Sequence, residues 1–329
     1  MRPRRSRRWS CVLSAALFLI GPGRASAQAS TGTEGAVFLL LPVGARATSL
    51  GEAVVASRNP SEAIWWNPAA VGTATHRQVA VHHSNSFVGT GDAVSLIVPS
   101  DVLGVLGVEF NILDYGEQQN RDGAGNLLGT LLPRSFVVGA TYGTLIGASA
   151  GVGLTFKLIQ MRADCTGSCQ LPSFSATTYA VDLGTQYDFG KHAPVTVGAS
   201  IRNIGLPFQI NDEAQSDPLP HRVQVGAEYR WTPPPSVADS VEVRASLDVL
   251  GGLDFGSPRP RIGGELAWRR RAFARAGYIA SQPGSENGGP SIGFGYVSGR
   301  FAIDLGRVLT GFSADANMAP TSLSLRLSF

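Results

Sequence analysis

The chain has 329 residues, of which 43% are hydrophobic and only 16% are charged, and its formal net charge is +3. Soluble domains carry roughly a quarter charged residues, so the composition argues against an ordinary soluble domain with a heavily charged exterior. The 40 glycines exceed the usual share of about 7%, which predicts many short strands joined by turns.

Residues 1–27 have the pattern of a cleaved secretory signal peptide. Five arginines lie among residues 2–8, an apolar run follows from Cys11 to Ile20, and Ala25-Ser26-Ala27 forms a small-residue cleavage site. The apolar run is shorter than the ~20 residues that cross a bilayer as a helix. We therefore expect cleavage before Gln28, or before Ser30, rather than an uncleaved anchor. Without the signal the chain has 21 basic and 24 acidic residues, and no basic patch for nucleic acid remains.

Residues 28–75 form a second segment, in which polar and apolar residues do not alternate. It is rich in small residues and contains two Asn-Pro steps, Asn59-Pro60 and Asn67-Pro68, and the adjacent pair Trp65-Trp66. Proline restricts the backbone, and asparagine bonds to neighbouring backbone groups. Each Asn-Pro step therefore predicts a turn.

Residues 76–329 consist of short segments of alternating polarity, each followed by a turn. Arg222–Trp231 and Val241–Val249 show the pattern best. With the segments that follow they give about fourteen strands, an even number that suits a closed barrel, and we predict an all-β transmembrane antiparallel β-barrel. A soluble β-sandwich is the alternative. The other segments are Gln78–Phe87, Asp92–Val98, Leu103–Leu113, Phe136–Leu145, Ser149–Met161, Ala176–Phe189, Val195–Ile204, Arg261–Arg269, Ala272–Ala280, Ser291–Val297, Arg300–Arg307 and the last strand.

A barrel of this size needs something to close it. Eight strands leave room only for side chains, and 16 to 18 leave an aqueous channel, so about fourteen should leave a hole. Residues 28–75 are available to fill that hole, and we predict that they form a plug, or hatch, inside residues 76–329. The alternative is a periplasmic loop.

The two cysteines beyond the signal, Cys165 and Cys169, lie four residues apart in a polar stretch. In an exported protein this spacing favours a disulfide that closes a small external loop. A metal pair or two free thiols are the alternatives, although zinc sites normally need four ligands.

Several charged residues are predicted to point into the barrel. Acidic and basic residues alternate between neighbouring strands, which favours cross-strand ion pairs around a filled interior. The alternative is a polar path for translocation. These residues are Glu228, Arg230, Glu242, Arg244, Asp248, Glu265, Arg275, Asp304 and Arg326.

The last strand alternates up to the final residue, Phe329. In a closed barrel this strand pairs with the first, so it leaves no exposed edge. Leu323, Leu325, Leu327 and Phe329 would then face lipid. A terminal aromatic residue on such a strand is similar to the signal read by the barrel assembly machinery, so Leu325, Leu327 and Phe329 form the predicted assembly signal.

The motifs of residues 28–75 resemble the N-terminal region of PorV/PorQ-type outer-membrane proteins, which are relatives of the long-chain fatty-acid transporter FadL. The resemblance implies a 14-stranded barrel in the bacterial outer membrane, with the Asn-Pro-Ala turn of its hatch inside the lumen. Many relatives carry an acidic pair upstream of that turn, whereas this chain has Arg58 and Glu62, which weakens any transfer of a ligand or partner. The matching residues are Gly44, Ala45, Arg46, Ala47, Leu50, Gly51, Glu52, Ala53, Trp66, Asn67, Pro68 and Ala69.

Patterns that indicate an enzyme have simpler explanations here. Gly147–Gly151 matches G-x-S-x-G, but a strand follows instead of the helix that a nucleophile elbow requires, so we interpret it as a hairpin turn. His82 and His83 are neighbours on one strand and face opposite sides, so they cannot bind one metal together. We expect no enzymatic activity, catalytic residue, cofactor or metal.

Two functions remain open. PorV-type proteins serve protein secretion, so the resemblance implies secretion-system proteins or exported cargo as partners, bound by external loops such as Asp114–Pro133 and Gly205–Pro220. FadL-like membership implies instead a passive transporter of a hydrophobic small molecule. Because the predicted lumen is polar and offers no evident apolar pocket, we favour the first interpretation.

Overall fold

The computed structural model describes residues 34–169, 173–190, 193–209, 216–231, 233, 240–253, 255, 258–280, 288–309 and 319–329. The predicted signal peptide, residues 1–27, lies outside the described residues, and so do residues 28–33 of the predicted hatch. No helix in the described part of the chain is long and apolar enough to cross a membrane.

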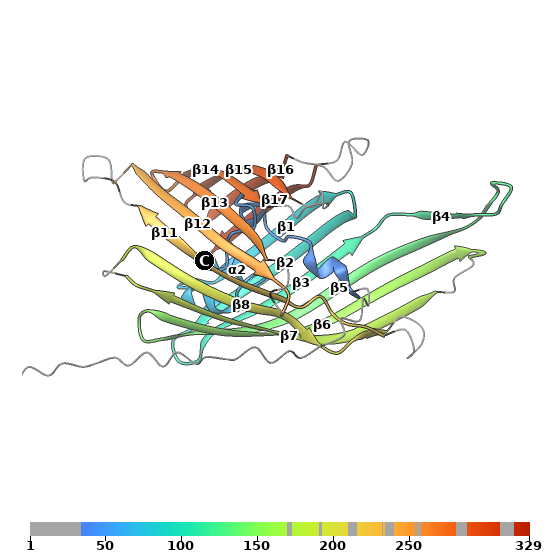
Figure 1. The fold of residues 1–329 in the computed structure, drawn as a ribbon, viewed down its shortest axis with the longest axis horizontal. Helices are drawn as coiled ribbons and strands as arrows, with labels where there is room; N and C mark the ends of the chain where they lie inside the picture. The colour runs from blue at the N-terminus through green and yellow to red at the C-terminus, as the bar shows by residue number, and fades with distance from the viewer. Residues whose placement is uncertain are drawn as a thin grey trace, which may run out of the picture. The chain divides into compact units, whose positions relative to one another are not determined.

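Fifteen strands of the described residues form one antiparallel sheet, in which all strands except β4 make a closed barrel (Figure 1). The short strands β9 (Phe208–Gln209) and β10 (Ser216–Asp217) form a separate two-stranded sheet. The prediction of a fourteen-stranded antiparallel barrel is confirmed. Its strands are β1 (Gln78–Ser86), β2 (Gly89–Ser100), β3 (Gly104–Asp114), β5 (Leu127–Ile146), β6 (Ala150–Gly167), β7 (Phe174–Asp188), β8 (Val195–Gly205), β11 (Arg222–Trp231), β12 (Val241–Gly251), β13 (Arg259–Trp268), β14 (Ala272–Ile279), β15 (Gly289–Ser298), β16 (Phe301–Val308) and β17 (Thr321–Ser328).

The first and last strands close the barrel. β1 pairs with β17 from Gln78↔Ser328 to Asn85↔Thr321, and the backbone N–H of Phe329 donates to the carbonyl of Arg77 at 2.9 Å. The pairing removes the sheet edge that a terminal strand would otherwise expose. The Phe329 side chain is half exposed on the outer face. Its role as an assembly signal stays a prediction.

Two strands are much longer than the sequence pattern indicated. β5 has 20 residues and β6 has 18, because both continue past the end of β3. The short strand β4 (Gln118–Arg121) pairs with the added part of β5. Pro133 lies between the end of the β3 pairing and the start of the β4 pairing, so its missing N–H removes no ladder bond. The predicted loop Asp114–Pro133 is therefore largely a β-hairpin extension (Figure 1).

The two ends of the barrel differ in their connections. We call one the turn end, where strands are joined by residues 101–103, 147–149, 189–194, 232–240, 269–271 and 299–300. The other is the loop end, where most connections are longer: 115–126, 168–173, 206–221, 252–258, 280–288 and 309–320. Outer-membrane barrels have short periplasmic turns and longer extracellular loops, so the loop end resembles the extracellular end of such barrels.

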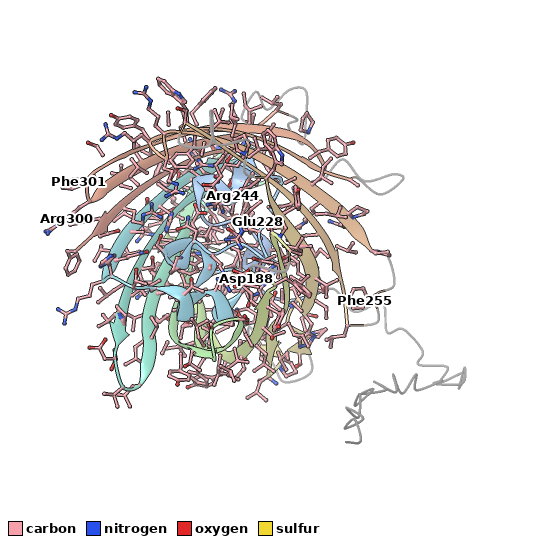
Figure 2. All side chains as sticks on the ribbon, turned by 90° about the vertical axis from the view of Figure 1, so that its left-hand side faces the viewer. Asp188, Glu228, Arg244, Phe255, Arg300 and Phe301 are labelled. Atoms are coloured by element: carbon pink, nitrogen blue, oxygen red, sulfur yellow. A yellow bond between two sulfur atoms is a disulfide. The ribbon has the colours of Figure 1, made fainter. Side chains whose placement is uncertain are left out.

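Residues 34–75, which we call the inner segment, fill the interior of the barrel (Figure 2). Their short helices are η1 (Val37–Leu40), α1 (Ala45–Ser49), α2 (Pro60–Ala63) and η2 (Pro68–Thr73). Most of their side chains are buried, and the residues from Ala45 to Ser49 have almost no exposed surface. The inner segment therefore lies in the lumen and does not form a loop at the turn end.

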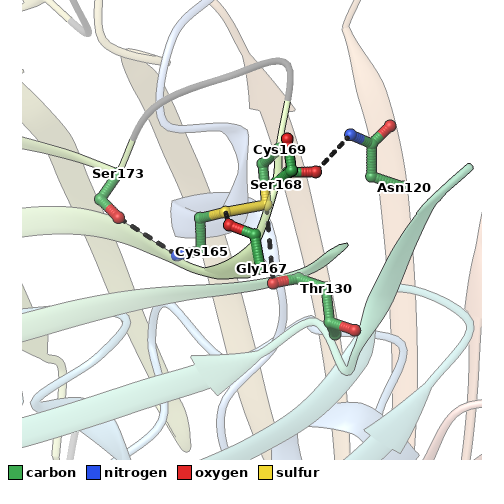
Figure 3. The surroundings of a disulfide bond; sticks show 7 residues. All are labelled: Asn120, Thr130, Cys165, Gly167, Ser168, Cys169 and Ser173. Carbon is green, nitrogen blue, oxygen red and sulfur yellow. Dashed lines mark hydrogen bonds between the residues drawn. A yellow bond between two sulfur atoms is a disulfide. The ribbon is translucent and has the colours of Figure 1, made fainter. Parts of the chain in front are cut away.

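The disulfide between Cys165 and Cys169 is present (Figure 3). Cys165 lies within β6, close to its end, because β6 runs further than predicted. The Cys165 backbone N–H donates to Ser173 Oγ at 3.2 Å. The disulfide therefore joins the end of β6 to the start of the connection to β7 (Phe174–Asp188).

Candidate functional site

The candidate site is the contact between the inner segment and the barrel wall. The turn at Asn67 is one of the places where the inner segment bonds to the wall. The Asn67 side chain is fully buried, its oxygen accepts from the Ala69 backbone N–H at 3.1 Å, and its amide donates to the carbonyls of Val55 at 2.7 Å and Thr185 at 3.2 Å. Asn67 thus caps η2, which begins with Pro68 and Ala69. It also links the inner segment to β7.

Glycines on the inner face of the barrel let the inner segment approach the strands closely. A Cβ atom at Gly153 would overlap Pro68, and one at Gly277 would overlap Gly51. These glycines form two groups on opposite parts of the sheet, so much of the unusual glycine content serves this contact. One group is Gly143, Gly153, Gly184 and Gly198 on β5–β8, and the other is Gly263, Gly277, Gly293 and Gly306 on β13–β16.

Neighbouring glycines on β13 give a direct test of this close packing. A Cβ at Gly263 would lie 2.6 Å from the Leu50 carbonyl oxygen, whereas a Cβ at Gly264, on the outer face, would meet only the Arg244 carbonyl oxygen at 4.0 Å. We expect Gly263→Val to destabilise the folded barrel by about 1–3 kcal/mol, as overpacking does in other cores. Gly264→Val should be neutral. The measurement is the temperature at which the folded band disappears on a semi-denaturing gel, and equal temperatures for both variants would contradict the assignment.

Arg46 on α1 is the centre of a buried charge network. Its Nε donates to Glu265 Oε2 at 3.0 Å, its Nη1 donates to Ser57 Oγ at 2.7 Å, and its Nη2 lies 3.8 Å from Glu228 Oε2. Glu265 in turn binds Arg275 at 2.6 Å. Arg46 is 4% exposed, so its charge is stabilised by these carboxylates and not by water.

Burial and nearby charges shift the pKa values of Arg46 and Glu62 in the inner segment. Burial alone would lower the pKa of Arg46, but the carboxylates of Glu265, Glu228 and Glu62 raise that pKa above its usual value, so Arg46 stays charged. Burial raises the pKa of Glu62 to about 7, and the charge of Arg46 opposes this shift. Glu62 Oε1 accepts the Arg46 backbone N–H at 3.0 Å. Burial therefore favours the neutral form of the Glu62 carboxyl more than water would.

The charged residues predicted to face the lumen are buried or half-buried, but many of their partners differ from the prediction. Pairs between neighbouring strands exist, such as Arg275 on β14 with Glu265 on β13 at 2.6 Å. Others join the wall to the inner segment, such as Arg326 Nη1 with Asn59 Oδ1 at 2.6 Å and Asp248 Oδ2 with the Val55 N–H at 2.9 Å. Sequence reasoning missed these contacts because it considered only neighbouring strands. In Figure 2, Asp188, Glu228 and Arg244 lie inside the barrel.

The remaining residues of the hatch motif lie at turns and contacts of α1. Gly44 has φ +100, a conformation that favours glycine, and a Cβ there would meet Glu62. The Ala45 N–H donates to Ser324 Oγ at 2.8 Å, and the Gly51 N–H donates to Ser291 Oγ at 3.1 Å. Trp66 Nε1 donates to the Val43 carbonyl at 3.0 Å. Ala47 and Leu50 pack with Val54 and Trp66 in one apolar cluster.

Apolar side chains gather inside the barrel at the loop end, which the sequence analysis overlooked. We call this group the mouth cluster. Phe38 of η1 packs there against residues that point inward from β3, β5, β6 and β7, and against Phe208 of β9 and Leu219 in the connection from β8 to β11. The lumen is therefore polar around Arg46 but apolar at its outer entrance. The buried members are Ala36, Phe38, Leu113, Val137, Ile159, Ala176, Ala180, Phe208 and Leu219.

A small cavity of about 40 Å³ lies where the mouth cluster meets the polar interior. A register shift marks a bulge in β8, where two residues face Asp182 of β7. One of the two is Asn203, which has φ +63 and donates its N–H to Asp182 Oδ1 at 2.7 Å. Asp182 pairs with Lys157 at 2.7 Å. Glu109 also lines the cavity, and within the described residues its Oε2 atom has no hydrogen-bond partner.

The motifs that could have indicated an enzyme have structural roles. Residues 147–149 form the hairpin turn between β5 and β6, with Gly147 at φ +67. His82 is buried and its Nδ1 lies 2.8 Å from Ser324 Oγ, whereas His83 is exposed and lies 2.7 Å from Asp92. The two histidines thus face opposite sides of the sheet, as predicted. Among the described residues no cluster of three metal-binding side chains exists.

Comparisons with known proteins identify the fold. No protein-family model matches the chain, and no curated protein matches its sequence. The Ralstonia pickettii toluene transporter TbuX superposes with a TM-score of 0.57 at 13% identity, over 89% of this chain and 100% of TbuX. The Pseudomonas putida toluene transporter TodX gives 0.58 at 12%, over 88% and 99%. A Pseudomonas aeruginosa FadL homologue gives 0.51 at 10%, over 88% and 98%.

At such low sequence identity, these superpositions show a shared fold but not a shared function or ligand. The chain has the barrel architecture of FadL-like proteins along nearly its whole described length. The narrower resemblance to PorV/PorQ-type proteins stays a prediction, since it depends on the sequence motifs alone.

Proposed function

We propose that the protein is a passive transporter of hydrophobic small molecules in the bacterial outer membrane. The mouth cluster carries this proposal, because it places apolar side chains inside the barrel at the end that faces the outside of the cell. An apolar solute that leaves water and becomes enclosed among these buried side chains is stabilised by the hydrophobic effect. The shared fold with proteins named as toluene transporters supports the same function.

In this proposal the inner segment is the hatch. The described structure is the closed state, since η1, α1, α2 and η2 occupy the lumen and their polar groups bond to the wall. A solute that passes the mouth cluster, which includes Phe38, would next reach the small cavity that Phe38 also lines. Passage then requires part of the inner segment to move, because a 40 Å³ cavity holds only one or two water molecules.

Two neighbouring residues of η1 test the role of the mouth cluster. Phe38 is 7% exposed and packs in the cluster, whereas Val37 is 58% exposed. In a bacterial host without its own carrier, we expect Phe38→Asp to reduce uptake of labelled toluene or fatty acid by roughly tenfold or more, because a carboxylate is costly among apolar groups. Val37→Asp should leave uptake near the level of the unchanged protein.

The folding of both variants is checked by the heat-dependent gel shift expected of an intact barrel. Phe38→Leu provides a further control, since it keeps the site apolar and should retain uptake. If the unchanged protein takes up no more solute than the empty host, the transport proposal is wrong.

Protein export remains the competing function, with a partner bound by one of the two external loops. Of the two loops predicted for this role, Gly205–Pro220 places Phe208 in the mouth cluster, and Leu219 packs beside it. The hairpin of β4 and β5 exposes Leu127 and Leu128 instead. If crosslinking recovers a protein through that hairpin while uptake is absent, export is the better assignment.

A further inference from the structure

A groove of about 310 Å³ lies on the outer face of the barrel, at the turn end of β15, β16, β17 and β1. Two rows of register partners line it. Tyr296, Ile303, Leu325 and Val81 form one row, and all four residues are between 44% and 52% exposed. The second row lies closer to the turn end and consists of Ser298, Phe301, Leu327 and Val79. The groove is therefore an apolar hollow on a surface that faces lipid.

Two exposed arginines border the groove at the turn end. Arg77 precedes Val79 by two residues, so both lie on the same face of the sheet. Arg300 lies in the turn before Phe301, and Figure 2 shows the side chains of Arg300 and Phe301 at the outer surface. Backbone bonds from Phe329 to Arg77 and from Ser328 to Arg300, each 2.9 Å, place the arginines on either side of the end of β17. They are thus about 10 Å apart, two strand spacings.

Neither arginine forms an ion pair with another residue in the described part of the chain. No acidic group in the described part of the chain lies within 4.0 Å of Arg77 or Arg300. Other arginines at this end do have partners: Arg270 lies 3.6 Å from Glu242, and Arg269 stacks over the Trp268 ring at 5.2 Å. Two unpaired positive charges beside an apolar groove complement an anionic head group joined to an apolar chain.

The wall that carries the groove is also the thin side of the barrel. β16 and β17 have 8 residues each. At ~3.4 Å per residue and a tilt of about 40°, they span roughly 21 Å of membrane, less than the ~25 Å apolar band of outer-membrane barrels. A bilayer adapts to a short wall by becoming thinner beside it. Thinning brings lipid head groups of the turn-end leaflet towards Arg77 and Arg300.

We propose that this groove binds one phospholipid of the turn-end leaflet. The phosphate lies between Arg77 and Arg300, and an acyl chain lies across Phe301, Leu327 and Ile303. The lipid is held by its anionic phosphate together with its chain. A free phosphate or an uncharged diacylglycerol makes only one of these contacts, so each should bind more weakly.

Native mass spectrometry of the full chain in detergent tests the site. Folded protein is mixed with phosphatidylglycerol, diacylglycerol or inorganic phosphate, and retained ligand is counted. We expect one phosphatidylglycerol per protein and little of the other two. The double variant Arg77→Gln/Arg300→Gln should bind phosphatidylglycerol about tenfold more weakly, and Ser298→Trp should displace it by filling the groove. Arg269→Gln/Arg270→Gln, with exposed arginines from another turn, should bind it as well as the unchanged protein.

Each variant is first shown to keep the gel mobility of the folded barrel, so that a loss of lipid binding is not confused with unfolding. If both double arginine variants lost phosphatidylglycerol binding equally, the protein would attract anionic lipid without a specific site, and the proposal would be rejected. Retention unaffected by Arg77→Gln/Arg300→Gln and by Ser298→Trp would also reject it. A protein dimer in place of the lipid adduct, lost in Ser298→Trp, would assign the groove to a second copy and overturn the proposal.

Discussion

Arg46→Met is expected to release the inner segment from the wall and open the barrel to ions. Arg46 reaches Glu265, Ser57 and Glu228 at once. Glu265 keeps Arg275 when Arg46 is removed, but Glu228, which is 3% exposed, has no other ion-pair partner among the described residues. Removal of one partner from a buried pair typically costs about 3–5 kcal/mol. Conductance in planar bilayers should therefore rise, and the unfolding temperature should fall.

Arg58→Met is the matched control, because it removes an arginine from the same segment. Arg58 binds Asp188 at 2.8 Å and is more exposed, and Asp188 keeps Arg230 at 2.9 Å when Arg58 is lost. Conductance should change little in this variant. The double variant Arg46→Met/Glu228→Gln should recover part of the stability, since it removes the stranded carboxylate. Equal conductance in Arg46→Met and Arg58→Met would refute the central position of Arg46.

The barrel could be predicted from the sequence because each strand shows its alternating pattern within a few consecutive residues. A strand between lipid and lumen must alternate, and Arg222–Trp231 or the terminal leucines show this within a few residues. The extension of β5 could not be predicted, because outside the membrane no apolar face is required and Pro133 interrupts the pattern.

The contacts of the inner segment could be predicted much less well. Arg46 stood out only as part of a motif, and nothing local shows that its partners are 182 and 219 residues away, as Glu228 and Glu265 are. The mouth cluster was missed for the same reason, since Leu113, Val137 and Ile159 each read as one apolar residue on a strand. Only the register of the closed barrel brings them together beneath Phe38.

The two Asn-Pro steps also look alike in the sequence but make different long-range contacts in the structure. This difference leads to a pair of substitutions with opposite expected effects. By sequence Asn59-Pro60 and Asn67-Pro68 are equivalent turns, and both asparagines precede a short helix. In the structure Asn59 Oδ1 accepts from Arg326 at 2.6 Å. The amide of Asn67 instead donates to two backbone carbonyls. A carboxylate can replace an acceptor but cannot replace a donor.

Asn67→Asp is therefore expected to be damaging, and Asn59→Asp to be tolerated. At position 67 the introduced carboxylate still caps Ala69 but faces the carbonyl oxygens of Val55 and Thr185, a loss of about 2–4 kcal/mol for two buried bonds and an unpaired charge. At position 59 it gains a charged partner in Arg326. The readouts are unfolding temperature and bilayer conductance at pH 7.5, repeated at pH 5, where protonation of the introduced carboxyl at position 67 restores one donor and should reduce the defect. If both variants lose stability equally, the donor role of Asn67 is wrong, and the turn is held by proline and the η2 cap alone.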